Sequence, residues 1–199
     1  MAYSEFTLLK IKETFGDFTI DQESNLFHSI EAVEVSNLLN EILKENIPLA
    51  LAVHTEKARS EFIIAPILVE LRKTLDHKIS LFSGIDFNVD PSIGLNGQCD
   101  FIISTSRDQL VLTAPLILIV EAKNENIKGG LGQCIAEMIA AKLFNEREEN
   151  QITTIYGVVT TGTAWRFLKL EDRIVSIDLP EYYIDNVGKI LGIFHNIVC

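Results

Sequence analysis

The chain has 199 residues, of which 47% are hydrophobic and 23% charged, and this size and composition suit one globular domain with a single core. Its longest apolar run, 114–120, is far too short to span a bilayer, its first residues lack a secretory signal pattern, and its three cysteines have neither disulfide-framework nor zinc spacing, so we expect a cytoplasmic protein. A formal net charge of −11 excludes a strong non-specific nucleic-acid binder, because phosphate contacts normally supply most of that affinity.

The N-terminal part, residues 1–55, is predicted to be mainly helical. Residues 6–11 and 15–20 are expected to be short strands or extended segments. Apolar residues recur at steps of three and four over 24–45, which predicts a helix that Asn46 and Pro48 end. A second helix is predicted over 55–75, with Thr55 as its N-cap and with Pro66 kinking or dividing it.

The rest of the chain predicts strands around one further helix. Residues 79–89 alternate like a strand, 99–105 follow a turn, and 116–121 are apolar on both faces, which predicts a central strand. A loop at 124–130 leads to a helix at 131–145, three strands are predicted at 155–160, 165–170 and 173–178, and a helix at 181–198 closes the chain. The fold class is therefore α/β, with one mixed sheet flanked by helices, in a single domain 1–199 with a core of about 56–178.

The sequence Glu121-Ala122-Lys123 places two opposite charges at the end of the central strand. Residues i and i+2 of a strand point the same way, so Glu121 and Lys123 share a face. Burial of these charges is costly unless each is paired or ligated, and packing alone gives no reason for them. Asp100 opens the preceding strand, and a hairpin through 106–110 would bring it beside Glu121.

Two carboxylates that converge beside a lysine predict a divalent-cation site. Hard oxygen ligands suit Mg²⁺, for which Mn²⁺ can substitute, and substrate phosphate commonly completes its coordination. The metal would lower the pKa of a bound water and neutralise charge on phosphorus. Lys123 would either orient that water or stabilise the developing negative charge.

The pattern Gly-x-x-Asp, then an apolar strand ending in Glu-x-Lys, then a helix with an early Gln resembles the core of the PD-(D/E)xK (restriction-endonuclease-like) nuclease superfamily. The resemblance covers about residues 60–170. It implies that Asp100 and Glu121 are metal ligands, with the carbonyl of Ala122 as another. It also implies that Lys123 is the catalytic lysine and Gln133 the glutamine of the helix after the catalytic strand.

Many members of that superfamily carry a further glutamate on the first core helix, and Glu61 is the residue that fits, with Glu70 as the alternative. One position departs from the pattern. The glutamine helix often has a tyrosine four residues after the glutamine, and this chain has Glu137 there. Glu61 and Gln133 could also be ordinary polar residues at the starts of their helices.

The hypothesis that follows is a Mg²⁺-dependent nuclease that hydrolyses DNA phosphodiester bonds. Two alternatives stay open: a catalytically silent nuclease-fold module for binding or assembly, and a hydrolase of a small phosphorylated substrate. DNA contact would depend on a local basic strip, and cleavage of both strands would make a homodimer natural. The candidates for the strip are Lys128, Lys142, Arg147, Arg166 and Lys169.

Overall fold

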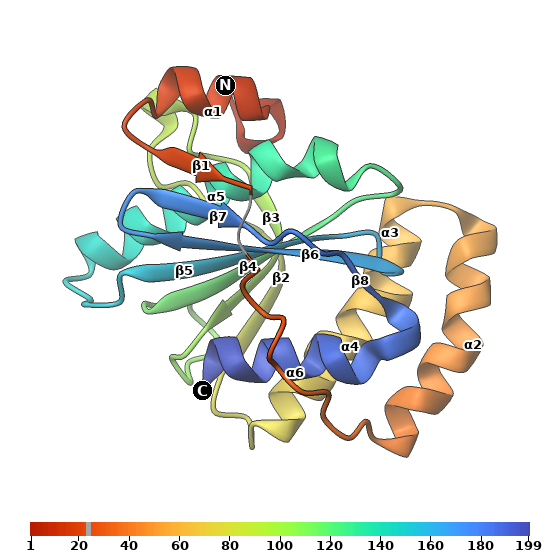
Figure 1. Cartoon of the computed structure of the whole chain (residues 1–199). Helices are drawn as coiled ribbons and strands as arrows, with labels where there is room; N and C mark the ends of the chain where they lie inside the picture. The colour runs from red at the N-terminus through yellow and green to blue at the C-terminus, as the bar shows by residue number, and fades with distance from the viewer. Residues whose placement is uncertain (23–24) are drawn as a thin grey trace.

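The computed structural model describes residues 1–22 and 25–199, which form one mixed β-sheet with helices on both faces (Figure 1). The strands are β1 (Thr19–Asp21), β2 (Ser80–Asp86), β3 (Gln98–Ser104), β4 (Leu116–Ala122), β5 (Thr154–Thr160), β6 (Ala164–Glu171), β7 (Ile174–Ile177) and β8 (Tyr182–Tyr183). They follow the order β1-β7-β6-β5-β4-β3-β2, and β8 also pairs with β6. The β4–β5 and β1–β7 pairs are parallel and the other pairs antiparallel. The predicted α/β class with a mixed sheet is confirmed.

Helices cover the two faces of this sheet unequally (Figure 1). The regular and π-helical segments are α1 (Leu8–Thr14), α2 (Asn37–Val53), α3 (Glu56–Arg59), η2 (Ser60–Ile64, a π-helical turn), α4 (Ala65–Thr74), α5 (Ile127–Arg147) and α6 (Val187–Val198), and short 3₁₀ turns lie at η1 (Tyr3–Glu5), η3 (Pro91–Ile93) and η4 (Ile184–Asn186). The long helix α5 and the N-terminal segment build the apolar core on one face, whereas α2, α4 and α6 build the core on the other. No helix in the described part of the chain is long and apolar enough to cross a membrane.

The strands predicted between residues 79 and 178 are all present, as β2 to β7. All residues of β4 are buried, which confirms that this apolar strand is central. The predicted closing helix is wrong at its start, because Tyr182 and Tyr183 pair with β6 as β8. Helix α6 begins only at Val187, where the side chain of Asn186 accepts a hydrogen bond from the backbone of Lys189.

The helix predicted over 24–45 is also wrong. Its first residue lies outside the described residues, and residues 25–36 contain no helix. The ammonium of Lys189 on α6 donates to the backbone carbonyls of Phe27, His28 and Ile30, and the amide of Val33 donates to the Gly188 carbonyl at 3.0 Å. These tertiary bonds use backbone groups that a helix would need, while the spaced apolar side chains still reach the core.

Helix α2 begins later than predicted and also ends later. It passes through Pro48 and stops at His54, which has a left-handed backbone with φ 57°. The prolyl ring costs the helix one backbone hydrogen bond. Lys44, whose carbonyl loses that bond, is exposed, so water can take its place. Pro48 therefore does not end the helix.

Residues 6–11 were predicted to be extended, but the structure has the short helix α1 there. Thr7 caps this helix, because its hydroxyl accepts a hydrogen bond from the backbone of Lys10 at 3.2 Å. The predicted cap at Thr55 is confirmed, because its hydroxyl accepts from the backbone of Ala58 at 3.1 Å. The predicted division near Pro66 is also present, as the π-helical turn η2 directly before α4.

Helix α5 starts at Ile127 rather than 131, because Asn126 caps it and Gly129 and Gly130 are helical. Gly132 lies against the N-terminal segment. A Cβ atom there would be 2.5 Å from the carbonyl oxygen of Phe6. This close backbone approach holds the N-terminal segment against helix α5.

We therefore expect Gly132→Ala to lower the free energy of unfolding by about 1–3 kcal/mol, as overpacking typically does, although alanine is the better helix former. For a domain of this size that is a fall in melting temperature of roughly 2–4 °C per kcal/mol. Thermal unfolding measures the change. Gly16→Ala is the control, because its Cβ would meet only the Lys12 carbonyl, at 3.4 Å. A melting temperature for Gly132→Ala that equals or exceeds the control would contradict the close packing.

Candidate active site

The two predicted carboxylates meet at one end of the β3–β4 pair. The register places Phe101 opposite Val120, so Asp100 and Glu121 follow on adjacent strands. The ladder stops at that pair, which leaves the amide of Ala122 without a backbone partner on β3. The carboxylate of Asp100 takes its place and accepts this hydrogen bond at 2.8 Å. The predicted neighbourhood of Asp100 and Glu121 is confirmed, and a hydrogen bond to the strand itself holds Asp100 in position.

Lys123 leaves the sheet on the same face as Glu121, under helix α5. Its backbone amide donates to the carbonyl of Thr160 at 2.8 Å, which continues the parallel ladder to β5. The ammonium is ion-paired with Oε1 of Glu121 and donates to Oε1 of Gln133 at 3.2 Å. Gly130 makes room for this side chain, because a Cβ atom there would be 3.0 Å from two of the lysine's methylene carbons. The site thus includes Gln133, as the resemblance implied.

The charges of Asp100, Glu121 and Lys123 only partly compensate one another. The side chain of Glu121 is 1% exposed and that of Lys123 21%. The pKa of Glu121 is raised from 4.5 to about 8, first by burial and then by the neighbouring Asp100, while Lys123 opposes both. Burial also raises the pKa of Asp100. Two adjacent carboxyls of low exposure cannot both ionise cheaply, which is why both pKa values are raised.

Lys123 remains an ammonium. Burial alone would lower its pKa, but the adjacent Glu121 outweighs burial and the pKa is raised. Its three protons can only be donated, and two of its partners, Glu121 and Gln133, are already in place. Lys123 is therefore a fixed positive charge at the end of β4, not a base.

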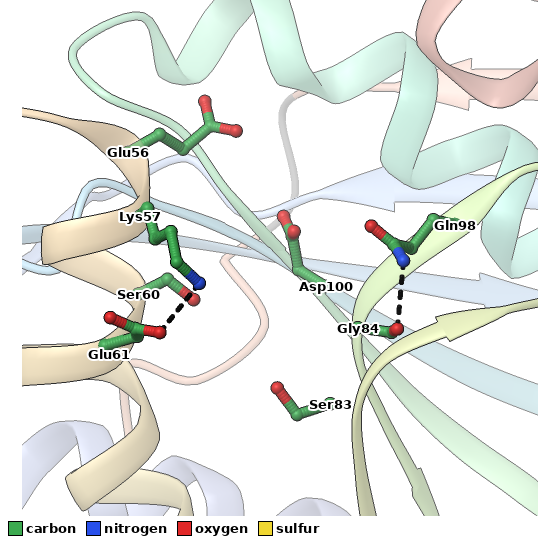
Figure 2. Close-up of a pocket in the computed structure, with 8 residues that line it drawn as sticks. All are labelled: Glu56, Lys57, Ser60, Glu61, Ser83, Gly84, Gln98 and Asp100. Atoms are coloured by element: carbon green, nitrogen blue, oxygen red, sulfur yellow. Dashed lines mark hydrogen bonds and ion pairs between the residues drawn. The ribbon is translucent and has the colours of Figure 1, made fainter.

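A cleft of about 250 Å³ opens beside Asp100 (Figure 2). One wall comes from α3 and η2, with Glu56, Lys57, Ser60 and Glu61. The other comes from β2 and β3, with Ser83, Gly84 and Gln98, and Asp100 points between the walls. Gly84 has a φ of 63°, a conformation that favours glycine, and a Cβ atom there would meet nothing within 4 Å. This glycine keeps the cleft wide next to Asp100.

The helical wall owes its shape to the π-helical turn. The extra residue in such a turn shifts the helix register, and π-turns are frequent at functional sites. Here it turns Ser60 and Glu61 toward the cleft while Ile63 and Ile64 stay buried. Glu61 is 53% exposed and pairs with Lys57 at 2.7 Å, so this predicted carboxylate does face the site.

The alternative residue, Glu70, does not face the site. It is buried on α4, pairs with Lys73 at 3.5 Å and lines grooves toward α2. Glu70 therefore lies outside the cleft, whereas Glu61 lines it together with Glu56.

Arg59 connects the helical wall to the strand ends, a role that the sequence analysis missed. Its side chain is buried and donates to Oδ1 of Asn124 at 3.1 Å and to the carbonyl of Thr161 at 2.9 Å. Asn124 directly follows Lys123. An arginine directly before Ser60-Glu61 and inside an otherwise apolar helix face was the available sequence signal.

Glu137 is a second residue near the site for which the sequence predicted no role. It was noted only as a departure from the family pattern. It is fully buried on α5, and its Oε1 accepts from Nε2 of Gln133 at 3.1 Å. Burial raises its pKa well above the ordinary value, and the nearby Glu121 adds to this.

The residues present suit a hard cation, although the protein supplies few ligands. Oε2 of Glu121 is buried and has no hydrogen-bond partner among the described residues, which is what a ligand atom awaiting a cation would show. Within residues 1–22 and 25–199, no group of three or more His, Cys, Asp or Glu is placed to hold a metal ion. Mg²⁺ commonly binds through one or two carboxylates and keeps water and substrate phosphate for its other positions.

The predicted basic strip is not formed as a free positive surface. Four of its five members are engaged by carboxylates: Lys142 with Glu146, Arg147 with Asp90, Arg166 with Glu181, and Lys169 with Glu171. The cleft itself is lined by three carboxylates and one lysine. Whatever binds at this site must therefore overcome a negative potential.

Comparisons with known proteins return no match: no protein-family model matches the chain, and neither a curated protein nor a solved structure is significantly similar to it.

The raised carboxyl pKa values predict a stability that falls with pH in the metal-free protein. Because the folded state holds a proton on Glu121 more tightly than the unfolded chain does, the free energy of unfolding decreases as pH rises from 4.5 to about 8. We expect Glu121→Gln to flatten this dependence, and thermal unfolding at about pH 6 and about pH 9 in a chelator measures it. Glu13→Gln, at an exposed position on α1, should leave the dependence unchanged. Parallel curves for wild type and Glu121→Gln would contradict the raised pKa.

Proposed function

We propose that this protein is a metal-dependent nuclease with a restriction-endonuclease-like core, which hydrolyses DNA phosphodiester bonds at the end of strands β3 and β4. The observation that carries the proposal is the convergence of Asp100, Glu121 and Lys123 beside an open cleft, with a buried carboxylate oxygen of Glu121 that has no hydrogen-bond partner among the described residues. Asp100 and Glu121 are 21 positions apart in sequence, and the β3–β4 register brings them together.

The order of elements also supports the proposal. Helix α3–α4, strands β2, β3 and β4, helix α5 and strand β5 follow one another, and they carry Glu61, Asp100, Glu121, Lys123 and Gln133 in the order that the family resemblance implies. The strand with Glu-x-Lys lies next to the strand with Asp, and the helix with Gln contacts the lysine.

Asp100 and Glu121 would hold the cation, with Glu61 across the cleft as a carboxylate for a second position. The carbonyl of Ala122 stays a predicted ligand. When bound, a Mg²⁺ ion lowers the pKa of a coordinated water and neutralises charge on the phosphate. Lys123 contributes a fixed ammonium beside the phosphate, which stabilises the negative charge that develops on its oxygens. Of the two roles that the sequence left open for Lys123, its ammonium state favours this one.

The acidic cleft determines how a nucleic acid can enter. Three carboxylates repel a polyanion until cations neutralise them, so substrate binding should depend on the divalent ion rather than on basic side chains. The same acidity is the observation that favours the alternative of a catalytically silent binding module. The two readings differ in whether metal binding leads to cleavage.

The decisive experiment is cleavage of supercoiled plasmid and of single-stranded DNA with Mg²⁺ or Mn²⁺. We expect the wild type to cleave and Lys123→Ala to lose at least about 100-fold in rate, the scale of a lost charge-stabilising group. Lys78→Ala, which removes an exposed lysine paired with Asp76, is the matched control and should cleave normally. Equal cleavage by wild type and Lys123→Ala would identify a contaminating nuclease. Metal binding without cleavage would favour the silent module or a small phosphorylated substrate.

DNA binding should itself require the metal. We expect Lys123→Ala, used to prevent cleavage, to bind a labelled DNA duplex with Mn²⁺ and to lose at least about tenfold in affinity in a chelator, because the ion offsets the carboxylate charge. Fluorescence anisotropy measures the affinity. The added variant Asp100→Asn should remove the effect of Mn²⁺, whereas adding Asp76→Asn, at an exposed turn, should not. Equal affinity with and without Mn²⁺ would show that DNA binds elsewhere on the protein.

A further inference from the structure

The side chains beneath the site form a chain of hydrogen bonds with a fixed direction. Lys123 donates to Oε1 of Gln133 at 3.2 Å, and Nε2 of Gln133 donates to Oε1 of Glu137 at 3.1 Å. An ammonium has no acceptor atom, so Gln133 must present its carbonyl oxygen to Lys123. The amide group of Gln133 then needs an acceptor on its other side, and Glu137 is that acceptor.

Glu137 occupies a place where packing alone would favour an apolar residue. Its side chain is fully buried in the core between α5 and the sheet, beside Cys134, Met138 and other apolar members of that core. Burial of an uncompensated carboxyl costs free energy, and its Oε2 has no hydrogen-bond partner among the described residues. Only the bond to Gln133 compensates it in part.

Burial raises the pKa of Glu137 well above its ordinary value, which favours the neutral carboxyl. The carbonyl-type oxygen of a neutral carboxyl can accept from Gln133 without adding a negative charge beneath Glu121 and Asp100. An ionised carboxylate at this depth would compete with Glu121 for the ammonium of Lys123.

We propose that Glu137 is a positioning residue of the active site, which fixes the orientation of the Gln133 amide and through it the place of the Lys123 ammonium. This inference rests on the proposed nuclease function for its catalytic consequence, but the orientation of Gln133 is independent of that function. Glu137 replaces, with a different hydrogen-bonding group, the tyrosine that the family resemblance places four residues after the glutamine.

Two substitutions of Glu137 distinguish a role in orienting Gln133 from a role in core packing. Glu137→Gln keeps a carbonyl oxygen that accepts from Gln133, whereas Glu137→Met keeps the length and removes the acceptor. In the metal-free protein, the side-chain amide of Gln133 can be followed by ¹H–¹⁵N NMR and assigned by its absence in Gln133→Met. We expect slow solvent exchange in wild type and Glu137→Gln, and exchange about tenfold faster in Glu137→Met.

Cleavage kinetics provide the second measurement. We expect Glu137→Met to lower kcat about tenfold with KM unchanged, and Glu137→Gln to keep the wild-type kcat. The double variant Gln133→Met/Glu137→Met should have the same kcat as Gln133→Met alone, because both residues act through Lys123. Thermal unfolding should show Glu137→Met to be as stable as wild type or more so, because a buried carboxyl is removed.

The outcomes distinguish the two proposals. If the wild type cleaves no DNA but Gln133 exchange responds to Glu137→Met as expected, the nuclease proposal fails and the positioning role stands. If the wild-type Gln133 amide exchanges as fast as an exposed glutamine, the positioning role is overturned, whether or not Glu137→Met folds. The positioning role is also overturned if the wild type is active and Glu137→Met retains its kcat. It is likewise overturned if kcat falls equally in Glu137→Gln and Glu137→Met.

Discussion

The burial of Glu121 and Lys123 at the end of β4 is the constraint on which the rest of the site depends. A carboxylate at 1% exposure beside a partly buried ammonium is tolerated only if neighbours complete their hydrogen bonds or a cation joins them. Asp100, Gln133 and Glu137 lie near the pair, while one oxygen of Glu121 has no hydrogen-bond partner in the part of the chain that the structure describes. A protein without use for charge here could fill this space with apolar side chains at lower cost, which is why the arrangement indicates chemistry.

The scaffold places these groups with rigid elements. Asp100 is bound to the backbone of β4, Lys123 continues the ladder to β5, and Arg59 joins the helical wall to the residues that follow both strands. Two glycines serve the site: Gly130 gives space to the lysine side chain, and Gly84 adopts a positive φ beside the cleft. The site is therefore preorganised by backbone contacts, which is the arrangement that electrostatic catalysis requires.

The electrostatics of the cleft would be unusual for the proposed nuclease. A net charge of −11 is not relieved by a local basic surface, because the strip residues are mostly paired with carboxylates. Affinity for a polyanion must then come from the metal and from the few donors near it. Such a site would discriminate against loose binding to DNA at physiological salt, since few counterions would be released on binding.

The sequence by itself determined the α/β class, the central strand and the local order of the Asp, Glu-x-Lys and Gln residues. It did so because hydrophobic periodicity, turns and strand alternation are local properties of the chain. It failed for residues 25–36, whose helical spacing of apolar residues was overruled when Lys189 and Gly188 of α6 bonded to their backbone groups. It favoured Glu61 but kept Glu70 as an alternative, and it gave Glu137 no role. Those depend on a π-helical turn and on the depth of α5 against the sheet, which only the packed tertiary structure decides.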